Sequence, residues 1–169
     1  MIDIKRKLKN FGPLEYLVLS SLFYVITMLI WTASTRASVL QKANDIKFNH
    51  KIIVEFINDE INKCSSKVDN LTSWGENCNS LWNSSKIVKY ILDNFKLNNP
   101  YSIEKPLIQT SQDPRIQAEG KAGQSTDKGI IFVSANNFES EAGSEWIIGT
   151  CIKSPCVAAG NNELVSVYR

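Results

Sequence analysis

An uncharged run of twenty positions, Tyr16 to Thr35, most constrains what this chain can fold into. The run reads YLVLSSLFYVITMLIWTAST and starts directly after an acidic residue, Glu15. A helix of about 20 mainly apolar residues crosses the hydrocarbon core of a bilayer. A carboxylate beside hydrocarbon costs several kcal/mol unless it is paired or neutralised. The sequence therefore predicts a membrane-spanning helix and a partner for Glu15.

Charged residues near this run predict its orientation. The first ten residues contain one acid, Asp3, and four bases: Lys5, Arg6, Lys7 and Lys9. Their net charge is +3, whereas the whole chain has a net charge of +2, so the residues after position 10 have a net charge of −1. We therefore expect no nucleic-acid contact. Basic residues stay on the cytoplasmic side, which places the residues after Arg36 across the membrane. The length of the run and the lack of a small-residue cleavage site favour a retained anchor over a secretory signal.

The four cysteines, Cys64, Cys78, Cys151 and Cys156, are all expected on the exported side, where disulfides form. Of three possible connectivities, short loop closure favours Cys64–Cys78 and Cys151–Cys156. His50, the only histidine, is expected on a helix surface and far in sequence from the last two cysteines. We therefore expect no metal site, no cofactor and no catalytic site.

Hydrophobic periodicity predicts one helix of roughly fifty residues that starts at Pro13. No glycine or proline interrupts the pattern before Gly75. Beyond Arg36, apolar residues recur every three or four positions: Val39, Ala43, Ile46, Ile53, Ile57, Ile61 and Cys64. The second half of the helix is therefore expected to be amphipathic, with Glu55, Asp59 and Glu60 on a solvated face.

The remaining residues predict a small α+β domain. Residues 65–80 are expected to form a loop, followed by a helix from Ser84 to Leu97 capped by Ser84 or Ser85. Weak strands are expected at Leu107–Thr110 and Arg115–Ala118, and stronger antiparallel strands at 129–134, 145–151 and 163–168. Trp74, Trp82 and Trp146 are expected in the core or in loop packing rather than on a binding surface.

The expected organisation is a basic leader, an apolar helix and one exported domain, because 169 residues leave room for one core. These parts cover residues 1–10, 11–35 and 36–169. The domain divides further into an amphipathic helix, a loop with a short helix, and an antiparallel sheet, at 36–63, 64–105 and 106–169.

This organisation resembles the type IV pilins and pilin-like proteins of bacteria. The resemblance is carried by the basic leader, by Phe11 with Glu15 four positions later, by the long helix, and by the C-terminal sheet with a nearby disulfide. In that family a peptidase removes the leader after a glycine, and the new N-terminal residue, often phenylalanine, is methylated. Here Asn10 precedes Phe11, and a cut after Gly12 would instead make Pro13 the first residue.

The resemblance implies a role for Glu15. In filaments of that family, the corresponding glutamate neutralises the terminal ammonium of a neighbouring subunit in an apolar core. A paired charge is tolerable there, whereas a lone charge is not. With Phe11 as the mature terminus, Glu15 would pair with it across subunits and set their register.

The resemblance further implies a structural filament subunit rather than an enzyme. The chain would lie in the bacterial inner membrane with its N-terminus in the cytoplasm, and later in an extracellular filament. Its partners would be copies of itself or other pilins, the leader peptidase and the inner-membrane assembly machinery. Two alternatives stay open: a minor pilin or secretion pseudopilin, and an uncleaved single-pass protein whose exported domain binds a periplasmic partner.

Overall fold

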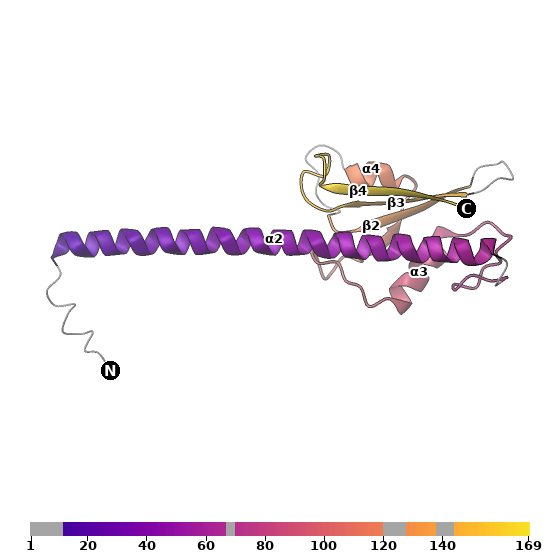
Figure 1. The fold of residues 1–169 in the computed structure, drawn as a ribbon, viewed down its shortest axis with the longest axis horizontal. Coiled ribbons are helices and arrows are strands. Elements are labelled where there is room, and N and C mark those ends of the chain that lie inside the picture. Colours follow the sequence, from indigo (N-terminus) through magenta and orange to yellow (C-terminus); the bar gives the residue numbers. More distant parts are fainter. Residues whose placement is uncertain (1–11, 67–69, 120–127, 138–143) are drawn as a thin grey trace. The chain divides into compact units, whose positions relative to one another are not determined.

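The computed structural model describes residues 12–66, 70–119, 128–137 and 144–169 (Figure 1). The chain divides into two units, Met1–Gln41 and Lys42–Arg169. The boundary lies within helix α2, which runs from Pro13 to Ser65. The α+β class and the single long helix predicted from the sequence are both confirmed.

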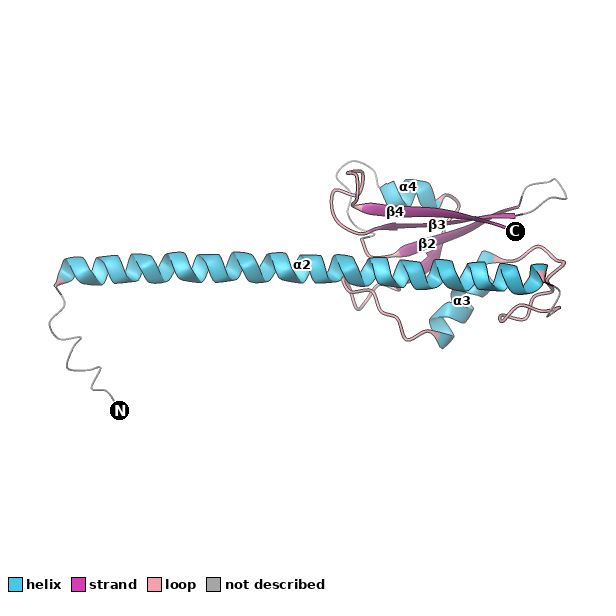
Figure 2. Cartoon of the chain, in the orientation of Figure 1, coloured by secondary structure: helices cyan, strands magenta, loops and turns pink. Residues whose placement is uncertain are grey.

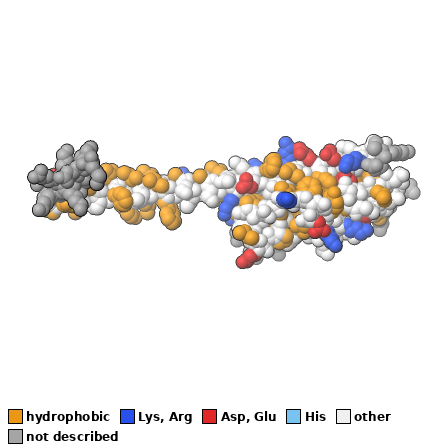
Figure 3. All heavy atoms as spheres, turned by 90° about the horizontal axis from the view of Figure 1, so that it is seen from below, with side chains coloured by type: hydrophobic (Ala, Val, Ile, Leu, Met, Phe, Trp, Pro, Cys, Tyr) orange, Lys and Arg blue, Asp and Glu red, His pale blue; other side chains and the backbone are white. Residues whose placement is uncertain are grey.

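The described part of unit 1 is Gly12 and the N-terminal part of α2, and every side chain from Pro13 to Gln41 is exposed. Figure 3 shows hydrophobic side chains on the surface of this segment. In unit 2 the predicted apolar stripe of α2 is buried from Ala43 onward, through Ile46, Ile53, Ile57 and Ile61. Val39 was expected in the same stripe, but it belongs to unit 1 and is 42% exposed.

The C-terminal half of α2 lies alongside a four-stranded sheet (Figure 2). Its strands are β1 (Ile108–Thr110), β2 (Ile131–Asn137), β3 (Ser144–Cys151) and β4 (Asn162–Tyr168). Their order is β1-β2-β3-β4, and the last three strands are antiparallel, as predicted. The short β1 pairs in parallel with β2, so the sheet is mixed rather than wholly antiparallel.

The expected strand at Arg115–Ala118 is wrong, because these residues lie in a short helix, α4 (Pro114–Glu119). Asp113 begins this helix by accepting a hydrogen bond from the Arg115 amide at 3.0 Å. An aspartate cap followed by proline at the first helical position favours a helix start over a strand. A Cβ atom on Gly149 of β3 would lie 2.7 Å from the Pro114 carbonyl oxygen, so α4 packs on bare backbone.

Helix α3 spans Ser84–Asn94, and both predicted ends need correction. Its cap is Asn83 rather than Ser84 or Ser85, because the Asn83 side chain accepts the Ser85 amide at 2.8 Å. The helix ends before Leu97 because Phe95 is extended, and the Phe95 ring packs 5.0 Å from the ring of Phe56.

The core of unit 2 joins α2, α3 and the sheet through large buried side chains. Trp82 and Trp146 are almost fully buried, with ring centroids 6.0 Å apart, and Trp74 packs edge-on against Trp82. These positions agree with the expected core role of the tryptophans. The structure also has the disulfides Cys64–Cys78 and Cys151–Cys156, the pairs that short loop closure favours.

Candidate functional site

Glu15 caps the start of α2 and forms only the glutamate half of a capping box, because Gly12 has no side chain to complete it. Gly12 precedes the helix, Pro13 is the first helical residue, and Glu15 is the third. The Gly12 amide donates to a Glu15 carboxylate oxygen, while the Gly12 carbonyl accepts from the Glu15 amide at 3.1 Å. A glutamate at this position satisfies an otherwise orphaned N–H group and complements the helix dipole. Glu15 thus has a partner within its own chain, which the sequence analysis did not anticipate.

The other predicted processing residues, Asn10 and Phe11, lie outside the described part of the chain. The capping box nevertheless distinguishes the two cleavage points. A cut after Asn10 would keep the Gly12 amide that Glu15 accepts. A cut after Gly12 would remove that amide, so Glu15 would lose its local partner.

Large apolar side chains dominate the exposed surface that follows Glu15. Leu14, Phe23 and Trp31 are 76%, 70% and 74% exposed, and none of the residues between them is buried. A monomeric soluble protein rarely exposes a contiguous apolar surface of this extent. In the described residues, one helix, α2, contains a segment long and apolar enough to cross a membrane. The segment is a candidate membrane anchor.

Five hydroxyl groups within this apolar segment donate to backbone carbonyl oxygens of their own helix. The pairs are Ser20 to Leu17 at 3.0 Å, Ser21 to Val18 at 2.8 Å, Thr27 to Tyr24 at 2.8 Å, Thr32 to Leu29 at 3.0 Å and Thr35 to Thr32 at 3.0 Å. Hydrocarbon supplies no hydrogen-bond partner, so polar groups there must be satisfied internally. These five side chains are therefore compatible with lipid or with an apolar protein core.

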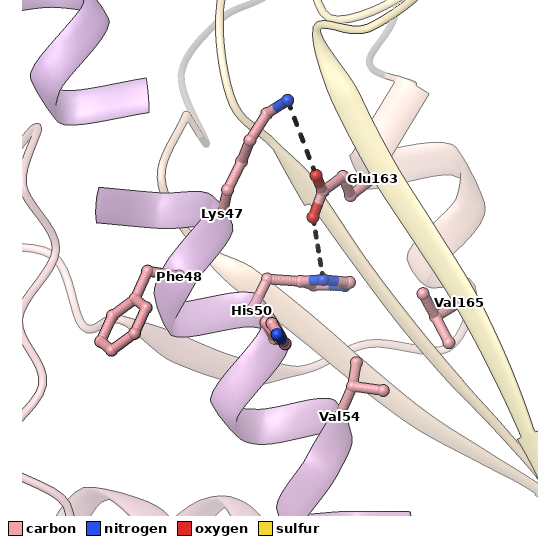
Figure 4. Close-up of a pocket in the computed structure, with 7 residues that line it drawn as sticks. Lys47, Phe48, His50, Val54, Glu163 and Val165 are labelled. Carbon is pink, nitrogen blue, oxygen red and sulfur yellow. Dashed lines mark ion pairs between the residues drawn. The ribbon is translucent and has the colours of Figure 1, made fainter. Parts of the chain in front are cut away.

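Unit 2 holds a pocket of about 370 Å³ between α2 and β4 (Figure 4). His50 and Lys47 extend from α2 towards Glu163 of β4. His50 Nδ1 lies 3.2 Å from Glu163 Oε2, and Lys47 Nζ lies 3.8 Å from Glu163 Oε1. His50 Nε2 lies 3.2 Å from the Ile148 carbonyl oxygen of β3. His50 is 2% exposed, so the expectation of a helix-surface histidine is wrong.

His50 and Lys47 join α2 to β3 and β4 through polar contacts at this pocket. Its lining residues are Lys47, Phe48, His50, Lys51, Val54, Glu163 and Val165. Burial lowers the pKa of His50, while the Ile148 carbonyl and the Glu163 carboxylate act in the opposite direction.

This lowered pKa predicts that mild acid weakens unit 2. The fold keeps His50 neutral where the unfolded chain would bind a proton, so stability is complete above the ordinary pKa of 6.5 and declines as pH falls through the lower folded value. We expect the thermal midpoint of the full chain in detergent to fall on acidification from about pH 7.5 to about pH 5.5. The variant His50→Gln should remove most of that decline. A wild-type midpoint that rises on acidification would contradict the prediction.

Two buried carboxylates fix the disulfide loop that follows α2. Glu60 accepts the Ser73 amide and hydroxyl, both at 2.7 Å, and the Lys63 ammonium at 2.6 Å. Glu76 accepts the Trp74 indole N–H and the Asn83 amide, both at 2.9 Å. Burial raises the pKa of each carboxyl, but the hydrogen bonds outweigh it and both pKa values lie below their ordinary value.

The burial of Glu60 corrects the expectation that Glu55, Asp59 and Glu60 share a solvated helix face. Glu55 and Asp59 are exposed, whereas Glu60 is 1% exposed. The loop from Asn70 to Asn83 folds back over that side of α2 and supplies donors to Glu60. A helix pattern alone does not reveal such a covering segment.

The described residues hold no group of three or more His, Cys, Asp or Glu side chains placed to bind a metal ion. Comparison of the chain with models of protein families, with curated proteins and with solved structures finds no match.

Proposed function

We propose that this chain is a structural subunit of a type IV pilus-like filament, anchored in the bacterial inner membrane before assembly. The observation that carries the proposal is the apolar part of α2, whose side chains are all exposed while five of its serine and threonine hydroxyl groups are bonded within the helix. Such a segment is stable when lipid covers it and equally when other apolar helices cover it. A filament subunit needs both environments in turn.

In this proposal an ion pair between subunits favours the transfer of α2 from the membrane into the filament. A helix that leaves lipid for a bundle of similar helices gains little hydrophobic free energy, so packing and polar pairs must set the register. In this proposal the N-terminal ammonium of one subunit, at Phe11, meets the Glu15 carboxylate of the next. The carboxylate has two oxygens, and the Gly12 amide uses one of them. The second oxygen is available for an ammonium group.

The proposed cellular route follows from this mechanism. The N-terminus starts in the cytoplasm, a leader peptidase removes residues 1–10, and the inner-membrane assembly machinery adds the subunit to an extracellular filament. Its neighbours are further copies or other pilins, and a place as minor pilin or pseudopilin fits the same mechanism.

A second candidate is an uncleaved single-pass protein whose exported unit binds a periplasmic partner. Two observations favour it: Asn10 stands before Phe11, and Glu15 already has a partner in its own chain. In that case the capping box alone accounts for the acid at the start of the apolar run.

The N-terminal residue of the protein recovered from cells tests the proposal. We expect mass spectrometry to find a methylated Phe11 at the terminus and electron microscopy to find fibres that contain the chain. An intact Met1 on a chain that stays monodisperse in detergent would instead establish the single-pass protein.

A further inference from the structure

Three loops of unit 2 meet around the ring of Tyr101. Lys42 Nζ of α2 lies 5.8 Å from the ring centroid, and Lys128 Nζ lies 4.6 Å from it. The Tyr101 hydroxyl donates to the Ile152 carbonyl oxygen at 2.6 Å, and the Gly129 amide donates to the Cys151 carbonyl oxygen at 2.9 Å. These contacts join the segments that follow α3, precede β2 and follow β3 into one group.

This group carries exposed apolar tips as well as lysines. Ile103 is 103% exposed at the tip of the Tyr101 loop, beside a pocket of about 390 Å³ that Lys42 and residues 100–104 line. Val157, just after the Cys151–Cys156 disulfide, is 61% exposed. We call Lys42, Tyr101, Ile103, Lys128, Lys153 and Val157 together the Tyr101 surface.

The charge of the Tyr101 surface is positive. Lys42, Lys128 and Lys153 contribute three positive charges. Glu104 and Lys105, adjacent in the loop, offset each other, and Asp45 is the next acid along α2. Lysines around an amphipathic tyrosine, with an aliphatic tip beyond them, match an interface between water and lipid headgroups.

Chain length limits the distance between Lys42 and the apolar run. Lys42 lies six positions after Arg36, where the uncharged run has ended. Even a fully extended chain of six residues spans only about 20 Å. A bilayer that holds the run therefore lies within reach of Lys42 and of the loop beside it.

We propose that the Tyr101 surface binds anionic phospholipid headgroups of the membrane that α2 spans. The lysines contact phosphate groups, and Ile103 enters the headgroup layer next to Tyr101. The inference rests on the membrane-anchoring part of the proposed function. It adds a second point of attachment, which a subunit must release when it leaves the membrane.

Hydrogen exchange on the full chain in nanodiscs tests this. One nanodisc contains phosphatidylcholine alone, and the other contains equal parts of phosphatidylcholine and phosphatidylglycerol. We expect the amides of residues 99–105 to exchange at least about threefold more slowly in the anionic nanodisc, because attraction of lysines to the surface adds to insertion of Ile103. Residues 70–83 form the loop that the Cys64–Cys78 disulfide links to the C-terminal end of α2. Their amides should exchange equally in both nanodiscs.

Matched variants assign any protection to this surface. Ile103→Ser changes a side chain that makes no buried contact, so it should leave the fold intact and remove most of the protection. Leu81→Ser alters another exposed aliphatic residue, 68% exposed and close in sequence to Cys78, and should leave the protection unchanged.

The outcomes separate the two proposals. Equal exchange of residues 99–105 in both nanodiscs, with the chain inserted, overturns the lipid contact and leaves the anchor intact. An equal effect of Ile103→Ser and Leu81→Ser also overturns it. A chain that does not stay with the nanodiscs contradicts the anchor itself, and the lipid contact with it.

Discussion

Replacing Glu15 with alanine is expected to leave the chain folded and inserted in the membrane but to reduce filament formation by at least about a hundredfold. In the proposed filament, the alanine variant buries a terminal ammonium without its carboxylate. Breaking a buried ion pair in this way costs about 3–5 kcal/mol, and about 1.4 kcal/mol corresponds to a factor of ten. The measurement is the amount of the chain in sheared fibres relative to the amount in the membrane.

The variant Glu15→Gln separates the two roles that Glu15 can have. Glutamine at this helix position still accepts the Gly12 amide, so the capping box survives while the negative charge is lost. If charge pairing drives assembly, Glu15→Gln should fail as Glu15→Ala does. Filaments of wild-type abundance from Glu15→Gln would reduce the role of Glu15 to capping and remove the pairing mechanism.

Replacing Glu60 with alanine is expected to destabilise unit 2 by about 2 kcal/mol, because it removes a buried carboxylate that accepts the Ser73 amide and hydroxyl. The loop closed by Cys64–Cys78 would then lose one of its two carboxylate contacts. Chemical denaturation of the full chain in detergent, followed by a signal from unit 2, measures the loss.

Glu55→Ala is the matched control for this measurement. Glu55 lies on the same helix, is exposed, and pairs with Lys51 at 3.6 Å. An exposed pair of this kind contributes roughly 0.5 kcal/mol or less. Losses of similar size in Glu60→Ala and Glu55→Ala would show that the buried contacts of Glu60 add nothing.

The long helix and the three antiparallel strands were predictable because each has a strong repeating pattern. The stripe from Ala43 to Ile61 repeats every three or four residues, and the strands 131–137, 144–151 and 162–168 follow one another closely in sequence. A hydrophobic repeat that continues over many residues fits only one type of secondary structure. The disulfide pairs were predictable for a similar reason, since both close short loops.

The errors fall on polar residues, whose surroundings come from distant segments. His50 and Glu60 lie on α2 at helical spacing from the buried apolar stripe, four residues after Ile46 and three after Ile57, but polar side chains there do not reveal their partners. Their partners, Glu163 and Ser73, are 113 and 13 positions away. By contrast, the helix at Pro114 had a local signal, the Asp113–Pro114 pair, and the contact of Gly12 with Glu15 had one in the glutamate at the third position of a helix that begins with Pro13. Attention to helix caps would have found both.

One tryptophan lies in the apolar run and three lie in unit 2, so intrinsic fluorescence can report on the two parts of the chain separately. Trp31 is 74% exposed within the apolar run, whereas Trp74, Trp82 and Trp146 form a chain of ring contacts at 5.1 and 6.0 Å in unit 2. Rings this close exchange excitation and act as one emitter. The emission of the Trp31→Phe variant would therefore report denaturation of unit 2 alone. Subtracting this emission from that of the wild-type chain would give the Trp31 signal, which would follow the transfer of the apolar run from lipid to fibre.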